Sequence, residues 1–147
     1  MIKVAQFGEG NFLRTFVDLY FQTLNDKGAD YEVHIIKPIE RGSLDAFDQQ
    51  KCHYHAVLRG MENEKATEKV YPISAVANAF SPFEEPEKYY ALARDPQLQL
   101  IVSNTTEAGI CYHDTDQFED FASITFPAKL TKFLYERFCA GLGGVYL

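Results

Sequence analysis

The first fourteen residues constrain the fold more than any other part of the chain. Residues 2–7 form a short apolar run rich in β-formers, Gly8 and Gly10 follow directly, and apolar side chains then recur with a helical period. This order of strand, glycine turn and helix is typical of a dinucleotide-binding turn, in which free N–H groups of the helix face a pyrophosphate. The two glycines alone are compatible with a dinucleotide site or with a turn that needs glycine only for its geometry. The second interpretation stays open because Leu13 stands where the usual fingerprint has a third glycine.

The first 37 residues predict one βαβ unit. A helix is expected over residues 12–26, and Lys27-Gly28 ends it with a cation followed by a glycine. Residues 31–37 form a second strand, which Pro38 ends. The right-handed crossover rule then makes the two strands parallel neighbours.

The rest of the chain continues this alternation. We expect a short helix over 43–50 capped by Ser43, then a hairpin with strands over 53–59 and 67–75 and a turn at 60–64. A helix over 86–94 and a strand over 98–103 follow. A last helix begins at residue 126, and its apolar face carries Leu130, Phe133, Leu134 and Phe138. The predicted fold class is α/β: a doubly wound, mostly parallel sheet with a small β-hairpin insertion. Residues 145–147 resemble the start of a further strand, so we expect the chain to be part of a longer protein.

Length and charge narrow the function. At 147 residues and 46% hydrophobic content, the chain is expected to form one domain with its own core. A net charge of −7 argues against a nucleic-acid partner. No run of about 18 apolar residues and no amino-terminal signal pattern is present, which predicts a cytoplasmic protein without membrane contact. Three scattered cysteines indicate free thiols and no disulfide framework.

Two polar residues follow the glycines. Arg14 lies in the first helical turn, where a cation opposes the helix dipole by some tenths of a kcal/mol and a bound phosphate would reverse that sign. Asn11 is expected either to cap the helix or to donate to a ligand oxygen.

Four sequence blocks, in order, carry a family resemblance: Gln6-Phe7-Gly8-Glu9-Gly10-Asn11-Phe12-Leu13-Arg14 with Phe16-Val17-Asp18, then Pro38-Ile39-Glu40, then Ser103-Asn104-Thr105-Thr106-Glu107-Ala108-Gly109-Ile110, then Pro127-Ala128-Lys129-Leu130-Thr131 with Tyr135-Glu136-Arg137-Phe138. The chain resembles the amino-terminal, Rossmann-like part of the mannitol dehydrogenase family of polyol-specific long-chain dehydrogenases. The third block is specific to the uronate-reducing branch of that family.

The resemblance implies an NAD-binding domain. By position, Gly8, Gly10, Asn11, Phe12 and Arg14 would cradle the pyrophosphate, Glu40 would bind the adenosine ribose, and Ser103, Asn104 and Thr105 would lie beside the nicotinamide ribose. The intact enzyme would interconvert tagaturonate and altronate by hydride transfer. The family's catalytic lysine, asparagine and histidine signature lies in a carboxyl-terminal domain, so no catalytic residue is expected in this chain and the chain alone is expected to be inactive.

Several alternatives stay open at this point. Lys37 and Arg41 could pair with the 2′-phosphate of NADP, but Glu40 would repel it, which favours NAD. Lys129 is expected either to touch substrate or cofactor or to be solvated. Cys52, His53 and His55, with Cys111 and His113 farther along, do not form a four-ligand zinc spacing, and no metal is expected.

Two other functions compete with the uronate reaction: a mannitol or fructuronate dehydrogenase of the same family, and a stand-alone nucleotide-binding module without catalysis. The expected small-molecule partner is a sugar acid. We also expect the chain to self-associate through the apolar face that a second domain would otherwise cover.

Overall fold

The computed structural model describes residues 1–118 and 125–147. Its strands are β1 (Ile2–Phe7), β2 (Tyr31–Ile36), β3 (Tyr54–Glu62), β4 (Lys65–Ile73), β5 (Val76–Phe80) and β6 (Leu98–Ser103). Its helices are α1 (Asn11–Asp26), α2 (Asp45–Gln49), α3 (Pro86–Ala93) and α4 (Phe126–Cys139), with a 3₁₀ turn η1 (Glu107–Gly109).

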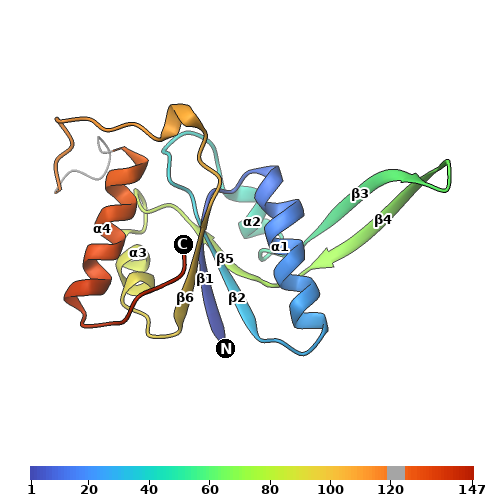
Figure 1. The fold of residues 1–147 in the computed structure, drawn as a ribbon, viewed down its shortest axis with the longest axis horizontal. Helices are drawn as coiled ribbons and strands as arrows, with labels where there is room; N and C mark the ends of the chain where they lie inside the picture. Colours follow the sequence, from blue (N-terminus) through green and yellow to red (C-terminus); the bar gives the residue numbers. More distant parts are fainter. Residues whose placement is uncertain (119–124) are drawn as a thin grey trace.

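A parallel sheet with strand order β5-β2-β1-β6 forms the centre of the molecule (Figure 1). The register places Phe7, the last residue of β1, opposite Ile36 of β2 and Ser103 of β6. Three strands therefore end at the same edge, as parallel strands must. Tyr146 adds one further parallel bridge to Leu100 of β6, in agreement with the predicted strand start at 145–147. The predicted doubly wound α/β class is confirmed.

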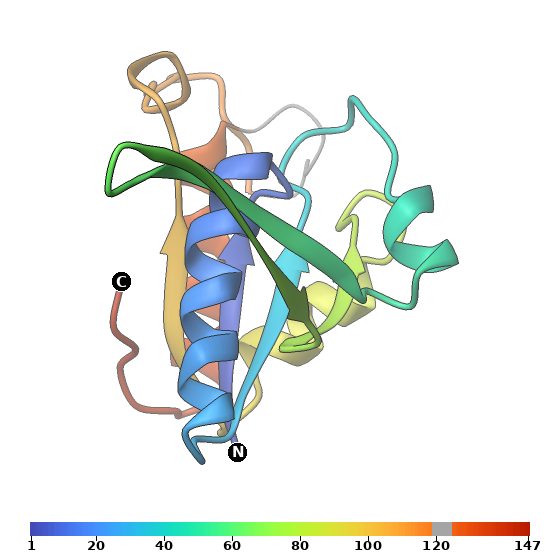
Figure 2. The same ribbon diagram turned by 90° about the vertical axis from the view of Figure 1, so that its right-hand side faces the viewer.

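Helices cover both faces of this sheet. Helices α1 and α2 lie on one face with the hairpin, and α3 and α4 pack together on the other (Figures 1 and 2). Successive residues of β1 point to opposite faces, so Val4 enters the core under α1 while Ala5 enters the core under α4. Both strand faces are buried toward the carboxyl ends, where the last four residues of β1 and of β2 are all buried.

Helix α1 forms as its sequence pattern predicts. Leu13 and Phe21 are buried against the sheet, and Lys27 is the residue that ends the helix. Gly28 follows with φ +95°, and its N–H donates to the Asn25 carbonyl at 2.9 Å. Glycine is favoured there because a side chain is strained at positive φ.

The hairpin differs from its prediction in length. Strand β3 runs through residues 60–62, which we expected to be part of the turn, and β4 begins at Lys65, two residues before the expected strand, so that Asn63 and Glu64 turn the chain. Both have positive φ, 51° and 62°, as a two-residue type I′ turn requires. The hairpin extends away from the parallel sheet, and its base lies against α1 (Figure 1).

Two other boundaries needed correction. Strand β5 is missing from the prediction. The expected strand over 67–75 ends directly before it, and its own sequence, Val-Ala-Asn-Ala-Phe, has no clear alternation of apolar and polar residues. Helix α2 begins at Asp45 rather than next to Ser43, although the Ser43 Oγ does accept a hydrogen bond from the Asp45 N–H at 2.9 Å.

Helix α4 buries a different face from the one predicted. Phe133 is fully buried and Leu130 and Leu134 pack against the core, but Phe138 is 77% exposed. Arg137 occupies the buried position instead, where its guanidinium donates to the carbonyls of Asp95 and Gly143. The prediction for Phe138 is therefore wrong, because this part of α4 turns Arg137 inward, where its guanidinium donates to buried carbonyls and its aliphatic stem packs.

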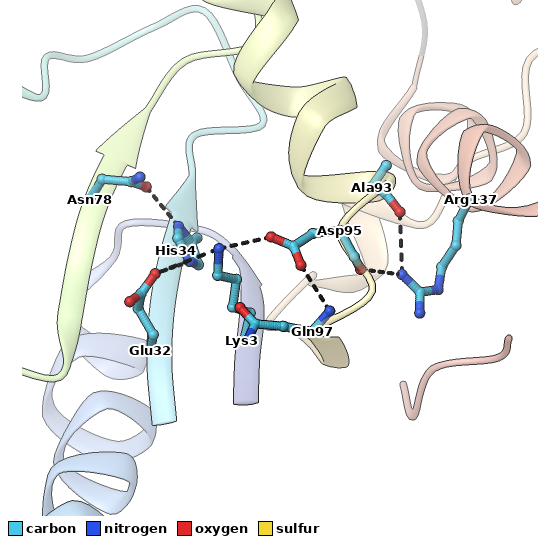
Figure 3. Close-up of polar contacts among 8 residues, drawn as sticks. All are labelled: Lys3, Glu32, His34, Asn78, Ala93, Asp95, Gln97 and Arg137. Atoms are coloured by element: carbon cyan, nitrogen blue, oxygen red, sulfur yellow. Dashed lines mark hydrogen bonds and ion pairs between the residues drawn. The ribbon is translucent and has the colours of Figure 1, made fainter. Parts of the chain in front are cut away.

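A network of polar side chains lies at the edge of the sheet where β1, β2 and β6 begin (Figure 3). Lys3 Nζ donates to Asp95 Oδ2 at 2.7 Å. Burial alone would raise the pKa of Asp95, but its hydrogen bonds from Lys3 and Gln97 outweigh burial and lower it. His34 lies between Glu32 and Asn78, and burial lowers the pKa of its imidazole. This network joins β1, β2 and β5 to the segment before β6, and a hollow of about 210 Å³ lies beside it, lined by Lys3, His34, Asn78 and Asp95 among others.

Candidate functional site

The predicted site residues lie at the carboxyl ends of β1, β2 and β6. The Gly8 N–H donates to the Ile36 carbonyl at 2.9 Å, so the glycine turn begins directly beside the end of β2. Ser103 lies across from Phe7 on the other side. The three predicted segments thus meet at one edge: Gly8, Gly10, Asn11, Phe12 and Arg14 after β1, Glu40 after β2, and Ser103, Asn104 and Thr105 at the end of β6. In open parallel sheets, ligands bind in the crevice at this edge.

The two glycines of the turn have different reasons to be glycine. Gly8 has φ +129°, and a Cβ there would lie 2.9 Å from Leu13 Cδ1, so the fold itself requires glycine. Gly10 has φ −68°, and apart from its chain neighbours no atom of the described residues lies within 4 Å of where its Cβ would be. Neither backbone nor packing therefore requires glycine at residue 10, and its Cβ position faces open space.

The start of α1 is free to bind an anion. Gly10 is the residue before the helix, no side chain caps it, and the first turn contains no acidic residue. The first N–H groups of a helix have no partner within the helix. Asn11 does not cap the helix, because its Oδ1 accepts a hydrogen bond from Arg14 Nη2. The capping alternative for Asn11 is therefore wrong.

Arg14 turns its side chain toward two aromatic rings. Its guanidinium carbon lies 5.5 Å from the centre of the Phe47 ring on α2 and 5.9 Å from that of the Tyr54 ring on β3. Its Nε is buried and has no hydrogen-bond partner among the described residues. The cation is thus fixed beside the glycine turn with part of its donor capacity unused.

A buried carboxyl on α1 was not found by the sequence analysis. Asp18 is fully buried one helical turn after Arg14, and its Oδ2 accepts a hydrogen bond from the Tyr54 hydroxyl. Burial raises the pKa of Asp18 to about 6, against the opposing effects of Tyr54, the nearby Gln6 amide and the Arg14 charge. The sequence signal that could have shown it is an acidic residue within the buried face of an amphipathic helix.

Two buried lysines donate hydrogen bonds to backbone carbonyls of the loop after β2. Lys37 Nζ donates to the Glu40 carbonyl and Lys129 Nζ to the Pro38 carbonyl, both at 2.7 Å. Lys129 also lies 4.7 Å from the centre of the Phe83 ring, and burial lowers the pKa of its ammonium. At 6% exposure, Lys129 is not solvated, and its observed role is to tie α4 to this loop. The Glu40 residue itself is exposed.

The loop after β6 packs on itself. A Cβ on Gly109 would lie 2.5 Å from Thr105 Cγ2, so this glycine lets the Thr105 side chain pack against the 3₁₀ turn. Ser103 and Asn104 are exposed. Farther along, a hollow of about 510 Å³ opens between residues 110–118 and the start of α4, with His113 and Lys132 among its lining residues. None of the predicted cofactor residues lines it.

Across residues 1–118 and 125–147, no three His, Cys, Asp or Glu side chains gather in a way that could hold a metal ion. None of the helices within these ranges is long and apolar enough to cross a membrane.

Comparison with known proteins gives consistent results. Residues 2–141 match the family model described as the mannitol dehydrogenase Rossmann domain. The altronate oxidoreductase of Pectobacterium atrosepticum is 42% identical over 139 residues, which cover 93% of this chain and 28% of that protein. The altronate oxidoreductase of Phocaeicola vulgatus is 36% identical over 138 residues, which cover 92% of this chain and 29% of that protein.

Solved structures share the fold. The ternary complex of Pseudomonas fluorescens mannitol 2-dehydrogenase with NAD and D-mannitol superposes with a TM-score of 0.78 at 17% identity, over 98% of this chain and 32% of the other. A substrate-free D-sorbitol dehydrogenase superposes with a TM-score of 0.71 at 21% identity, over 98% of this chain and 33% of the other. The chain therefore spans at most about a third of the length of these relatives and structures.

Proposed function

We propose that this chain, which belongs to the mannitol dehydrogenase family, is the NAD(H)-binding domain of an oxidoreductase that acts on a sugar acid. The observation that carries the proposal is the open space at Gly10, at the uncapped start of a helix. A pyrophosphate in that space would accept hydrogen bonds from the first N–H groups of α1 and lie in the favourable end of the helix dipole. Asn11, Phe12 and Arg14 would complete this part of the site.

The other two segments are assigned to the two riboses. Glu40 is exposed just past β2 and would accept hydrogen bonds from the adenosine ribose hydroxyls. Ser103, Asn104 and Thr105 would border the nicotinamide ribose at the end of β6. The positions of these segments along one sheet edge, with β1 between β2 and β6, support this order.

The contacts of the loop after β2 favour NAD over NADP. A 2′-phosphate needs a free cation, but Lys37 is 2% exposed and its Nζ is engaged by the Glu40 carbonyl. Lys129 is similarly engaged by the Pro38 carbonyl. Of the three cations of the described chain discussed at this loop, Arg41 is the exposed one, next to the exposed Glu40 carboxylate. The carboxylate would repel a 2′-phosphate, so we expect NADH to bind more tightly than NADPH.

For the whole protein we propose the interconversion of tagaturonate and altronate. NADH, when bound, supplies a hydride to a carbonyl carbon, and the residues of this chain bind and orient it. Support comes from relatives of 36–42% identity that are altronate oxidoreductases. Proton transfer and sugar-acid selection are assigned to a carboxyl-terminal part, as the lengths of those relatives suggest, and the chain alone is expected to be inactive.

Titration calorimetry tests cofactor binding. NADH is titrated into the wild-type chain, into Gly10→Val and into Gly60→Val. Gly60 is a matched control, because its Cβ would also meet no atom within 4 Å but it lies in the hairpin strand β3. We expect binding to the wild type and to Gly60→Val and a loss of binding in Gly10→Val. Equal binding by all three would contradict a pyrophosphate site at Gly10.

The cofactor preference has its own test. Replacing Glu40 with alanine should lower the NADH to NADPH affinity ratio by at least about tenfold, because like charges brought together cost several kcal/mol. Glu64→Ala at the hairpin tip is the charge-matched control and should leave the ratio unchanged. An unchanged ratio in Glu40→Ala would remove Glu40 from the ribose site.

The substrate proposal needs a protein of the relatives' length that contains this chain. Oxidation of NADH, followed by absorbance, is expected with tagaturonate and much slower with fructuronate or fructose. Preference for either of the latter two substrates would place the protein in another branch of the family.

A further inference from the structure

Four polar side chains meet between the glycine turn and the hairpin, and the binding site proposed above does not account for all of them. They come from three elements: Gln6 from β1, Arg14 and Asp18 from α1, and Tyr54 from β3. Gln6 and Asp18 are both fully buried. The Tyr54 hydroxyl donates to Asp18 Oδ2, and the Gln6 Nε2 donates to the Gly8 carbonyl at 3.3 Å. The cluster therefore connects the glycine turn to the base of the hairpin.

The contacts within this cluster set the position of Arg14. The guanidinium lies over the Tyr54 ring, and the hydrogen bond to Asp18 fixes that ring through its hydroxyl. Asp18 also follows Arg14 by four residues on α1, the spacing at which opposite charges on a helix attract. Asp18 thus acts on Arg14 in two ways: through the ring that supports it and through its charge.

Two oxygen atoms in the cluster lack a partner. Asp18 Oδ1 and Gln6 Oε1 are buried, and neither has a hydrogen-bond partner among the described residues. A buried acceptor without a donor costs about 1–3 kcal/mol. A proton on Asp18 Oδ1 would remove the buried charge of the carboxylate, while Tyr54 continues to donate to Oδ2.

We propose that Asp18 is the positioning residue of the dinucleotide site: it holds Arg14 in place through Tyr54, and it takes up one proton when a pyrophosphate binds at the glycine turn. This inference rests on the NAD(H) binding proposed above. The proton comes from the solvent and converts the carboxylate to a carboxylic acid, with no other bond made or broken. The pyrophosphate brings negative charge to the cation that otherwise balances Asp18, so ionised Asp18 becomes less favourable in the complex.

Among the residues that the structure describes, few other titrating groups surround Asp18. The Tyr54 hydroxyl and the Arg14 charge face the carboxyl directly, and Gln6 is neutral. Cys52 is a further titratable neighbour next to Tyr54, and burial raises the pKa of its thiol, which keeps it neutral. Asp18 is therefore the group that changes charge near neutral pH, since burial already raises its pKa to about 6 in the free chain.

The sign of the pH effect follows from this arrangement. Binding raises the pKa of Asp18, so the complex holds more protons than the free chain. Affinity for NADH is then highest below about pH 6 and falls as pH increases through the range between the free and bound pKa values. Each unit by which the pKa rises corresponds to about a tenfold fall in affinity across that range.

Calorimetric titration of the chain with NADH, in two buffers of different ionisation enthalpy across pH 5.5 to 8, counts the protons taken up. Wild type should take up a fraction of a proton with a maximum above pH 6. Asp18→Asn can still accept from Tyr54 but cannot titrate, so its uptake should be absent and its affinity independent of pH. Asp26→Asn, an exposed carboxyl on the same helix, is the matched control and should behave as wild type.

Tyr54→Phe distinguishes a positioning role from a general loss of structure. It keeps the ring under Arg14 but removes the hydroxyl that lowers the pKa of Asp18, so the uptake maximum should move to higher pH. Carbon-13 NMR of the ligand-free chain provides an independent measurement: one aspartate, absent in Asp18→Asn, should titrate near pH 6.

The outcomes are distinguishable. NADH binding without proton uptake, or with the same uptake in Asp18→Asn, overturns this inference and leaves the proposed function intact. An unmoved maximum in Tyr54→Phe also overturns it. No NADH binding by the wild-type chain contradicts the proposed function, and the inference with it.

Discussion

Exchanging each glycine of the turn for alanine should separate what the fold requires from what the ligand requires. Gly8→Ala places a side chain at φ +129°, a backbone conformation that costs of the order of 1–3 kcal/mol for a residue other than glycine. Its Cβ would also lie 2.9 Å from Cδ1 of Leu13, the end of a flexible side chain that can shift at a smaller cost. Backbone strain is therefore the main effect, and it predicts a loss of roughly 1–3 kcal/mol in the free energy of unfolding.

Gly10→Ala should show the opposite behaviour. Its φ of −68° is ordinary and its Cβ would meet no atom within 4 Å, so we expect a stability change of at most about 1 kcal/mol, from replacing glycine at a helix start. The methyl group would occupy the proposed pyrophosphate space, so NADH affinity should fall by about tenfold or more.

Urea unfolding followed by circular dichroism measures the first effect and calorimetry the second. Gly8→Ala with wild-type stability would refute the strain argument. Gly10→Ala with wild-type affinity would refute the assignment of the open space.

Three further predictions concern stability and association. Asp18→Asn should stabilise the fold at pH 7.5 by about 3 kcal/mol, because folding raises the pKa of that carboxyl from 3.8 to about 6 and one unit is about 1.4 kcal/mol. The raised pKa destabilises the fold only at pH values above the pKa of the unfolded carboxyl, so the gain should vanish toward pH 4. Urea unfolding measures it, and equal stability of the variant and the wild type at pH 7.5 would contradict this prediction. Asp95→Ala should cost about 1–3 kcal/mol in the same assay, since Lys3 loses its 2.7 Å partner, while NADH affinity should stay unchanged at this opposite edge. Phe12 and Phe16 stack on each other while 57% and 65% exposed, which predicts that the chain self-associates and that Phe16→Gln shifts it toward monomer; a monomeric wild type in sedimentation would refute this.

The parts of the fold that the sequence predicts are those with one strong local pattern. Helix α1 has an apolar period and a cation–glycine end, and strands β1, β2 and β6 are short apolar runs between turn residues. Local energetics and tertiary packing agree in these segments, so periodicity alone is sufficient. The meeting of the three predicted site segments at one edge also follows from strand direction, without knowledge of any side-chain position.

What the sequence could not predict depends on contacts between distant residues. Strand β5 exists because β2 offers it a pairing edge, and its own sequence has no alternation. Lys129 reads as a surface cation at a helix start, yet the Pro38 carbonyl, 91 residues away in sequence, takes up its ammonium. Asp18 and Tyr54 are 36 residues apart, so their hydrogen bond has no local sequence signal. Buried polar groups of this kind are specified by their partners and are recognised only in the folded chain.

The central claim is that three separate segments at the carboxyl edge form one dinucleotide site. Titrating NADH into the nitrogen-15-labelled chain and following its amide resonances by NMR tests this claim most directly. The account predicts saturable shifts at Gly8 to Arg14, around Glu40, and at Ser103 to Thr105, with none at Lys3, His34 or Asp95 on the opposite edge (Figure 3). Shifts that spare the glycine turn, or that centre on the amino-terminal edge, would contradict it.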